Sequence, residues 1–352
     1  MITFLLTLAF QIPPIVAVTP TSTSTFKEPQ VAVENDGHVY IAYGAGNTVF
    51  ISVSSDKGKT FGSPIKVAEA GTISLGMRRG PRIAAQNGKV TITAVYGQKG
   101  KGADGDIVTF RSENHGETWT SGAKVNDVQG AAREGLHAMA IAPNGTLACT
   151  WLDLRSKGTT LYLSTSKDSG KSWSKNRLAY ESPSGSICEC CHPSLAYDPY
   201  GRLFVMFRNS LDGARDMWGM FTNNGVEFSK PTKIGKESWI INACPMDGGM
   251  ITVDSKGKAT AIWRRESSVY STSLANEETL AGPGQQPWGA FGDDGLYMVW
   301  MGPKGIMSKT PGKAGLLVSG LGTDPVVASS PDHKIVVAAW TENGIKASRL
   351  AK

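Results

Sequence analysis

The sequence predicts an all-β fold, a β-propeller built from four-stranded antiparallel blades. Three observations predict it: glycine supplies 41 of the 352 residues while long windows with a helical apolar period are missing, turn signals recur along the chain, and a second turn motif repeats in phase with them. Average proteins contain about 7% glycine, so this content indicates many tight turns. A recurrence of about 40 to 50 residues in a β-rich chain is typical of propeller blades.

The first series of turns sets the number of blades. Seven turns rich in Asn, Asp and Gly, each flanked by short apolar strands, end at positions 37, 88, 145, 201, 257, 295 and 333. Their spacings are 51, 57, 56, 56, 38 and 38 residues. Asn-Gly and Asp-Gly pairs supply the positive φ angles that two-residue hairpins require, so each turn joins the two inner strands of one blade. Seven blades are favoured, and six remain open if one of the two short units is an insertion.

The first four units carry a second turn motif between their outer strands. Its pattern is Ser-x-Asx-x-Gly-x-Ser/Thr-aromatic, at residues 54–61, 112–119 and 166–173, with a degenerate copy at 221–228. The Asx side chain and the hydroxyl groups can bond the backbone of a tight turn, and the aromatic ring plugs the sheet packing. The motif is therefore structural, and we assign it no catalytic role.

The two ends of the chain are expected to complete the ring. The seventh unit has only three strands before Lys352, and the apolar segment Ile15 to Val18 can supply the fourth, which removes the free sheet edge. Residues 12–352 are read as a single propeller domain and residues 1–11 as a leader remnant. The apolar stretch from Met1 to Phe10 is shorter than the roughly 20 residues of a membrane span. It resembles the apolar region of a secretory leader, although the positively charged region and a clear cleavage site are missing. Export is favoured over a simple apolar tail, so we expect an extracytoplasmic location.

The charge balance narrows the choice of partners. Lys and Arg number 36 against 30 Asp and Glu, which gives a net charge of +6 and a pI near 9.0, without runs of like charge. This pattern excludes a nucleic-acid footprint and indicates a mild preference for anionic small molecules. We expect a monomer that binds a glycan or another anionic small molecule and requires no cofactor.

The strand order sorts the connections onto two faces. With strands lettered A to D from the axis outward, the A–B hairpins and C–D turns share one side, the hairpin face, and the D–A and B–C connections share the other, the loop face. The loop face receives most of its charge from units two to five, and units six and seven contribute little. The alternative to a binding role is that arginines there pair with neighbouring carboxylates, as Arg155 with Asp153 or Arg215 with Asp216. The arginines expected to suit a carboxylate or another planar anion are Arg79, Arg82, Arg155, Arg208, Arg215 and Arg264.

Four of the five cysteines cluster on the loop face, whereas Cys149 lies in a predicted strand and is expected in the core. Cys188 and Cys244 each precede the turn glycine of their unit by 13 residues, so they occupy equivalent positions in adjacent blades. For an exported protein the first expectation is a disulfide between Cys244 and either Cys188 or Cys190. Free thiols or a copper(I) or zinc site are the alternatives, although the Cys-x-Cys-Cys spacing differs from that of structural zinc sites. The ligands of such a site would be Cys188, Cys190 and Cys191, with His192 or Cys244.

The repeats, the blades and the arginine-bearing loop face resemble the sialidase (neuraminidase) superfamily, whose Asp-box or BNR repeat has the pattern of the second turn motif. The resemblance covers about residues 25–350, and the segments 187–193 and 244–248 resemble a cysteine-containing branch of bacterial sialidase-like proteins. It implies an exo-glycosidase in which three arginines hold the carboxylate of sialic acid, a Tyr assisted by a Glu is the nucleophile, and an Asp is the general acid. The positions that would take these roles are Tyr96 and Glu134 for the pair, Asp153 or Asp247 for the acid, and Arg82, Arg208 and Arg264 for the clamp.

The chain departs from that family in two respects. The Arg-Ile-Pro motif that opens the first sialidase blade has its nearest match at Gly80-Pro81-Arg82-Ile83, in the second unit and with the proline on the wrong side. Active sialidases also have six blades. Two functions therefore stay open: a hydrolase of an anionic glycan, and a non-catalytic extracytoplasmic propeller that binds a partner, glycan or metal through the same face. The fold does not decide between them.

Overall fold

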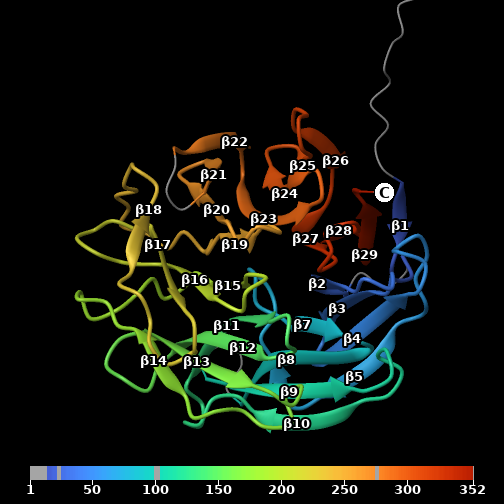
Figure 1. Ribbon diagram of the computed structural model, residues 1–352, viewed down its shortest axis with the longest axis horizontal. Helices are drawn as coiled ribbons and strands as arrows, with labels where there is room; N and C mark the ends of the chain where they lie inside the picture. The colour runs from blue at the N-terminus through green and yellow to red at the C-terminus, as the bar shows by residue number, and fades with distance from the viewer. Residues whose placement is uncertain (1–13, 22–24, 99–103, 274–276, 352) are drawn as a thin grey trace, which may run out of the picture.

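The computed structural model describes residues 14–21, 25–98, 104–273 and 277–351, apart from the side chains of residues 133 and 134. These residues form seven antiparallel sheets and no helix, arranged around a central axis (Figure 1). The predicted all-β propeller with seven blades is confirmed. The leader remnant expected at residues 1–11 lies outside the described residues.

The strands of each blade follow one another in sequence from the axis outward. Blades one to three are β2 (Lys27–Val33), β3 (Val39–Ala45), β4 (Thr48–Ser54) and β5 (Ile65–Glu69); β7 (Arg82–Gln86), β8 (Lys89–Gly97), β9 (Asp106–Ser112) and β10 (Thr120–Lys124); and β11 (Ala132–Ile141), β12 (Leu147–Asp153), β13 (Thr160–Ser166) and β14 (Arg177–Tyr180). Blades four to six are β15 (Ser194–Tyr197), β16 (Leu203–Arg208), β17 (Met217–Thr222) and β18 (Thr232–Ile234); β19 (Met250–Val253), β20 (Ala259–Arg265), β21 (Ser268–Ser273) and β22 (Thr279–Pro283); and β23 (Gln285–Gly292), β24 (Gly295–Gly302), β25 (Gly305–Lys309) and β26 (Leu316–Ser319). A short additional strand, β6 (Thr72–Ile73), pairs with the end of β8.

The seventh blade combines both ends of the chain. It consists of β27 (Thr323–Ser329), β28 (Val336–Thr341) and β29 (Ile345–Arg349), with β1 (Ile15–Ala17) as its outermost strand. Ile15 lies opposite Ser348, and the backbone N–H of Val18 donates to the carbonyl of Ile345 at 2.9 Å. The closure predicted from the apolar segment at the start of the chain is confirmed.

The Asp-boxes form the turns that the repeat predicts. In the first, Ser54 Oγ accepts the N–H of Gly58 at 2.9 Å, and Asp56 accepts the N–H groups of Lys59 and Thr60 at 3.0 and 2.9 Å. The boxes of blades two and three repeat the bonds of Gly58 and Thr60, whereas the N–H groups of Glu117 and Lys171 donate to the backbone carbonyls of Asn114 and Asp168. The indole of Trp173 reaches back to donate to Thr109 in blade two, so this box also seals the gap to the preceding blade.

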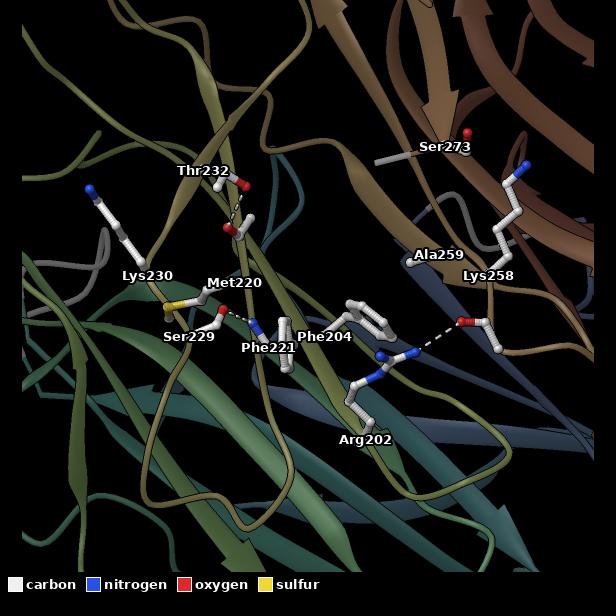
Figure 2. A pocket seen from close by; sticks show the side chains of 12 residues that line it. Arg202, Phe204, Met220, Phe221, Ser229, Lys230, Thr232, Lys258, Ala259 and Ser273 are labelled. Carbon is white, nitrogen blue, oxygen red and sulfur yellow. Dashed lines mark hydrogen bonds between the residues drawn. The ribbon is translucent and has the colours of Figure 1, made fainter. Parts of the chain in front are cut away.

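Blade five has no Asp-box, and a crevice of about 500 Å³ lies between it and blade four (Figure 2). The Arg202 guanidinium lies over the rings of Phe204 and Phe221 there, at 4.7 and 5.5 Å from their centroids. In the earlier blades the glycine of the following box fills this space; Gly170, for example, lies against Thr91 and Thr109 of the preceding blade. The crevice therefore follows from the missing repeat.

The Asp-box bonds make a direct prediction for stability. Because Asp56 accepts several hydrogen bonds within one turn, Asp56→Ala is expected to lower the free energy of unfolding by about 1 to 2 kcal/mol. Urea titration measures the change. The neighbouring exposed Lys59→Ala variant serves as the control, and an Asp56→Ala variant as stable as this control would contradict the turn's structural role.

Candidate functional site

Three inner strands begin on the loop face with a residue in the left-handed conformation, followed by proline. Glu28, Gln286 and Asp324 have φ angles of 59°, 52° and 53°. In each case the pairing of the strand with its neighbour shifts register at this position, which identifies a β-bulge. Non-glycine residues with positive φ cost energy and concentrate at functional sites. These bulges therefore identify the loop face near the axis as a candidate functional site.

Arg78 links the bulges of blades one and six. Its side chain is buried, with 1% exposed, and its backbone N–H donates to Glu28 Oε1 at 3.2 Å. The guanidinium donates to the carbonyl oxygen of Gln286 and lies 5.2 Å from the ring centroid of Trp288. Arg78, from the loop before blade two, therefore contacts blades one and six.

Glu28 is a buried carboxyl group with charged neighbours. Burial raises its pKa to about 8, and the negative charge of Asp324 acts in the same direction. The positive charges of Arg78 and Arg82 oppose the rise. At neutral pH the Glu28 carboxyl is consequently protonated in most molecules, whereas an ordinary glutamate is ionised.

Arg208, the last residue of β16, lies between blades four and five. Its buried guanidinium donates to three backbone carbonyls, those of Asp247 at 2.9 Å, Arg215 at 2.5 Å and Arg264 at 2.9 Å. The guanidinium carbons of Arg208 and Arg264 lie 5.3 and 5.4 Å from the ring centroid of Trp239. One buried cation thus fixes three backbone segments that carry charged side chains.

Asp247 connects this cluster to blade six. Its Oδ1 accepts the N–H of Gly249 at 3.3 Å, and its Oδ2 accepts the N–H of Gln286 at 2.5 Å. The neighbouring Arg264 donates to Gln285 Oε1 at 3.0 Å. The loop face therefore holds one connected network of charged and amide groups around the axis.

The six predicted arginines fall into two groups. Arg82 and Arg208 are buried and donate to backbone carbonyls, and Arg155 pairs with Asp153 at 2.9 Å and Asp127 at 2.8 Å, as the alternative interpretation expected for Arg155. Asp216, by contrast, accepts bonds from Ser238 and the N–H of Trp239, not from Arg215. Besides Arg155, the partly exposed members are Arg79, Arg215 and Arg264.

The residues predicted for the chemistry do not all meet at the axis. Tyr96 lies in the core shared by blades one and two, where burial raises the pKa of its hydroxyl and Ala68 accepts its hydrogen bond at 3.5 Å. Asp153 is fully buried and accepts bonds from Arg155 and the indole of Trp151. The side chain of Glu134 lies outside the described residues. Of the four, Asp247 is the one whose described side chain joins the axial network.

The prediction that units six and seven contribute little to the loop face is wrong, since the carbonyl of Gln286 accepts from Arg78 and the charge of Asp324 acts on Glu28. Blade one also contributes, through Glu28. A signal was present: each residue precedes a proline and stands nine positions before the turn residue of its unit, at 37, 295 and 333. The same bulge, with a polar residue at positive φ, therefore recurs at the same position of three blades and places these residues at the same level of the loop face.

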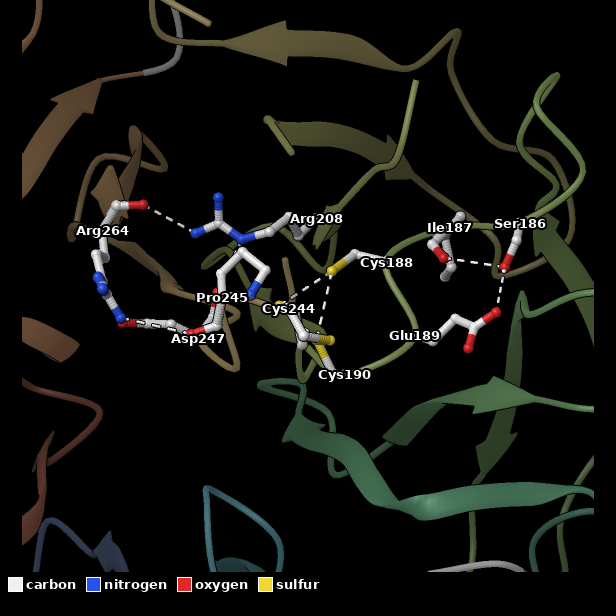
Figure 3. Close-up of a disulfide and its surroundings, with 11 residues drawn as sticks. Ser186, Ile187, Cys188, Glu189, Cys190, Arg208, Cys244, Pro245, Asp247 and Arg264 are labelled. Atoms are coloured by element: carbon white, nitrogen blue, oxygen red, sulfur yellow. Dashed lines mark hydrogen bonds between the residues drawn. A yellow bond between two sulfur atoms is a disulfide. The ribbon is translucent and has the colours of Figure 1, made fainter. Parts of the chain in front are cut away.

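The cysteine cluster contains one disulfide, between Cys190 and Cys244, which ties the loop before blade four to the loop before blade five (Figure 3). This confirms one of the two predicted pairings. Cys188 and Cys191 are free and buried, with Sγ atoms 3.2 Å apart. The hydrogen bond with Cys191 lowers the pKa of the Cys188 thiol to about 7, and the positive charge of Arg208 adds to the effect. Cys149 is the core residue predicted from its strand.

His192 points to a different part of the site. Its ring stacks on Trp288, with centroids 5.7 Å apart, and burial together with the charges of Arg82 and Arg78 lowers its pKa. Among the described residues, the sulfur atoms that lie close enough to share a metal ion are those of Cys188, Cys190 and Cys191, and that group does not include His192.

Comparison with known proteins supports the class inferred from the repeats. Residues 77–239 match the model of the BNR repeat-like domain, which confirms the predicted resemblance to sialidase-like BNR propellers. No curated protein matches the sequence significantly. The described residues include no helix that could cross a lipid bilayer.

Solved structures of glycoside hydrolases share the fold. An α-L-arabinanase of Penicillium chrysogenum is 13% identical with a TM-score of 0.60, over 96% of this chain and 97% of that one. The GH93 α-L-arabinofuranosidase of Fusarium graminearum is 12% identical with a TM-score of 0.57, over 97% of each chain. The NanB sialidase of Streptococcus pneumoniae is 12% identical with a TM-score of 0.54, over 94% of this chain and 69% of that one. The chain is thus a glycoside-hydrolase-like propeller in its fold.

Proposed function

We propose that the protein acts outside the cytoplasm as a monomer that binds an anionic sugar on the loop face and hydrolyses the terminal glycosidic bond of its glycan. The site is the partly exposed side of the axial network, at Arg215 and Arg264, with the buried carboxyl group of Asp247 beside them. The proposal keeps the class of function that the sequence indicates and places it on different residues.

The observation that carries the proposal is the arrangement around Arg208. Its guanidinium bonds the carbonyls of Arg215, Arg264 and Asp247, so it fixes two partly exposed arginines and a carboxyl group relative to one another. The guanidinium of Arg215 makes no hydrogen bond to a described residue, which leaves its five donors for a ligand. Paired guanidinium donors suit the planar carboxylate of an acidic sugar.

Two carboxyl groups in different environments suit glycoside hydrolysis. One carboxyl must protonate the leaving oxygen, and a second must act as nucleophile or base. Arg78 connects these two groups: its N–H donates to Glu28, and its guanidinium donates to the carbonyl of Gln286, whose N–H donates to Asp247. The pKa of Glu28 is raised to about 8, whereas Asp247 accepts backbone N–H groups. We assign the role of general acid to Glu28 and the role of nucleophile or base to Asp247.

The disulfide supports the extracytoplasmic location, because such bonds persist in oxidising compartments. It also joins the loops that carry the proposed site, since Cys244 stands three residues before Asp247. A site held by such a bond keeps its geometry without help from a bound ligand.

Titration calorimetry with N-acetylneuraminic acid, glucuronic acid and neutral arabinose tests the binding. The acidic sugars are expected to bind, and Arg215→Ala and Arg264→Ala are each expected to weaken that binding by about 10- to 100-fold, the loss of one charge-assisted contact. Arg177→Ala, which removes an exposed arginine of β14, is the matched control.

Methylumbelliferyl glycosides of the same sugars test the hydrolysis. Release of the fluorophore by the wild type, and its loss in Asp247→Asn and Glu28→Gln, is the expected result. Acidic sugars that bind no better than arabinose would contradict the proposal. Specific binding without turnover would instead identify the non-catalytic binding propeller.

A further inference from the structure

Three cysteine sulfur atoms in the loop before blade four are separated by distances typical of a metal-thiolate site. Cys188 Sγ is 3.8 Å from Cys190 Sγ and 3.2 Å from Cys191 Sγ, and the last two are 3.9 Å apart. Three sulfurs bound in one plane at about 2.3 Å from a metal would be about 4.0 Å from one another. We propose that Cys188, Cys190 and Cys191 bind one copper(I) ion, and that the disulfide between Cys190 and Cys244 closes this site until a thiol reductant opens it.

The ligand set favours copper(I) over zinc. Soft thiolate ligands select copper(I), whereas structural zinc takes four ligands in a tetrahedron. The sulfur atoms close enough to share one ion belong to three buried cysteines, with exposed fractions of 0%, 8% and 1%. The fourth cysteine, Cys244, lies on the exposed stretch 242–244. We call it the cap, because its disulfide with Cys190 blocks one ligand of the site and Cys244 is not itself a ligand.

The surroundings of the three sulfurs suit a negatively charged cluster. Three thiolates and one copper(I) carry a net charge of −2, which is costly to bury without compensation. The guanidinium groups of Arg208 and Arg215 act on Cys188, and backbone N–H groups of Cys190 and Asp247 donate to Cys188 and Cys191. Figure 3 shows the Arg208 side chain beside the Cys188 sulfur and the disulfide.

The disulfide has one accessible sulfur. Cys244 is exposed while Cys190 is almost buried, so an external dithiol reaches Cys244 Sγ first. Its thiolate attacks Cys244 Sγ, the bond between the two cysteines breaks, and Cys190 leaves as a thiolate that takes up a proton. The second thiol of the reductant then displaces Cys244 as a thiol. The reductant ends as a disulfide, having supplied two electrons and two protons.

Two cysteine variants separate the cap from the ligands. Cys244→Ser and Cys190→Ser both remove the disulfide, yet only Cys190→Ser also removes a proposed ligand. Prepared anaerobically without reductant, Cys244→Ser is expected to bind one copper(I) per molecule, and Cys190→Ser to bind it at least 100-fold more weakly. Cys149→Ala, in the core of blade three, is the matched control and should behave as the wild type.

Competition against the chromophoric copper(I) complex of bicinchoninate measures the affinity, and circular dichroism confirms that each variant is folded. Wild-type protein is expected to take copper(I) from this complex after treatment with dithiothreitol and desalting, but not before. X-ray absorption should then find sulfur neighbours alone around the metal.

Three results would overturn the proposal: equal copper binding before and after reduction, binding that survives in folded Cys188→Ser and Cys191→Ser variants, or preferential binding of zinc by the reduced protein. The proposal does not depend on the glycan site. Failure of sugar binding would leave the copper measurements unaffected.

Discussion

Replacing Arg208 with alanine is expected to lower the free energy of unfolding by about 3 to 5 kcal/mol. The guanidinium is buried and donates to the carbonyls of Asp247, Arg215 and Arg264, so its removal leaves three acceptors without their partner and opens a space beside Trp239. Unsatisfied buried groups of this kind account for many of the largest mutational effects. Denaturant unfolding followed by tryptophan fluorescence measures the loss.

The exposed arginine of β14 provides the comparison for this experiment. Arg177→Ala is expected to change the free energy of unfolding by less than about 0.5 kcal/mol, as exposed substitutions usually do. An Arg208→Ala variant that unfolds at the same denaturant concentration as Arg177→Ala would show that the three carbonyls find other donors at little cost.

The stability of the protein relative to Glu28→Gln is expected to fall as the pH rises from 5 to 8. The pKa of Glu28 is raised from 4.5 to about 8 in the folded protein, so within this window the folded state holds a proton that the unfolded state has lost. Each pH unit therefore removes up to about 1.4 kcal/mol from the free energy of unfolding. The amide side chain of the variant cannot titrate. The difference in the free energy of unfolding between wild type and variant should therefore change by about 3 kcal/mol across the window.

Urea titrations of both proteins at several pH values test this expectation. Other groups titrate in both proteins, so the difference isolates Glu28. A difference in the free energy of unfolding between wild type and Glu28→Gln that stays constant across the window would mean that Arg78 and Arg82 keep the Glu28 carboxyl ionised.

Much of the fold could be predicted because its determinants are local. A hairpin turn needs only its Asn, Asp or Gly residues, and an Asp-box such as residues 54–61 closes its hydrogen bonds within one turn. The repetition of these turns then indicates the number of blades. Even the pairing of β1 with β29 follows from counting, since seven blades of four strands require one more strand than the last unit contains.

The candidate site was less predictable because its contacts connect distant segments. Arg208 lies on the loop face as expected, but sequence alone does not show that its guanidinium bonds three backbone carbonyls. The spacing of Cys188 and Cys244 correctly indicates adjacent blades, yet the bond forms with Cys190, two residues further along. Glu28 gains its raised pKa from burial and from Asp324, which lies far away in the sequence, and no local pattern reports that proximity.

The seventh blade imposes an order on folding. Residues 15–17 are made more than 300 residues before their partners at 346–348, so the ring stays open until both segments are available. Closure over so long a separation is slow, since the entropy of joining the ends must be overcome before the contacts form. Until then β29 presents an unpaired edge, and the first strand of another copy could pair with it as readily as the molecule's own. Dilute conditions therefore favour closure of the ring within one chain during refolding.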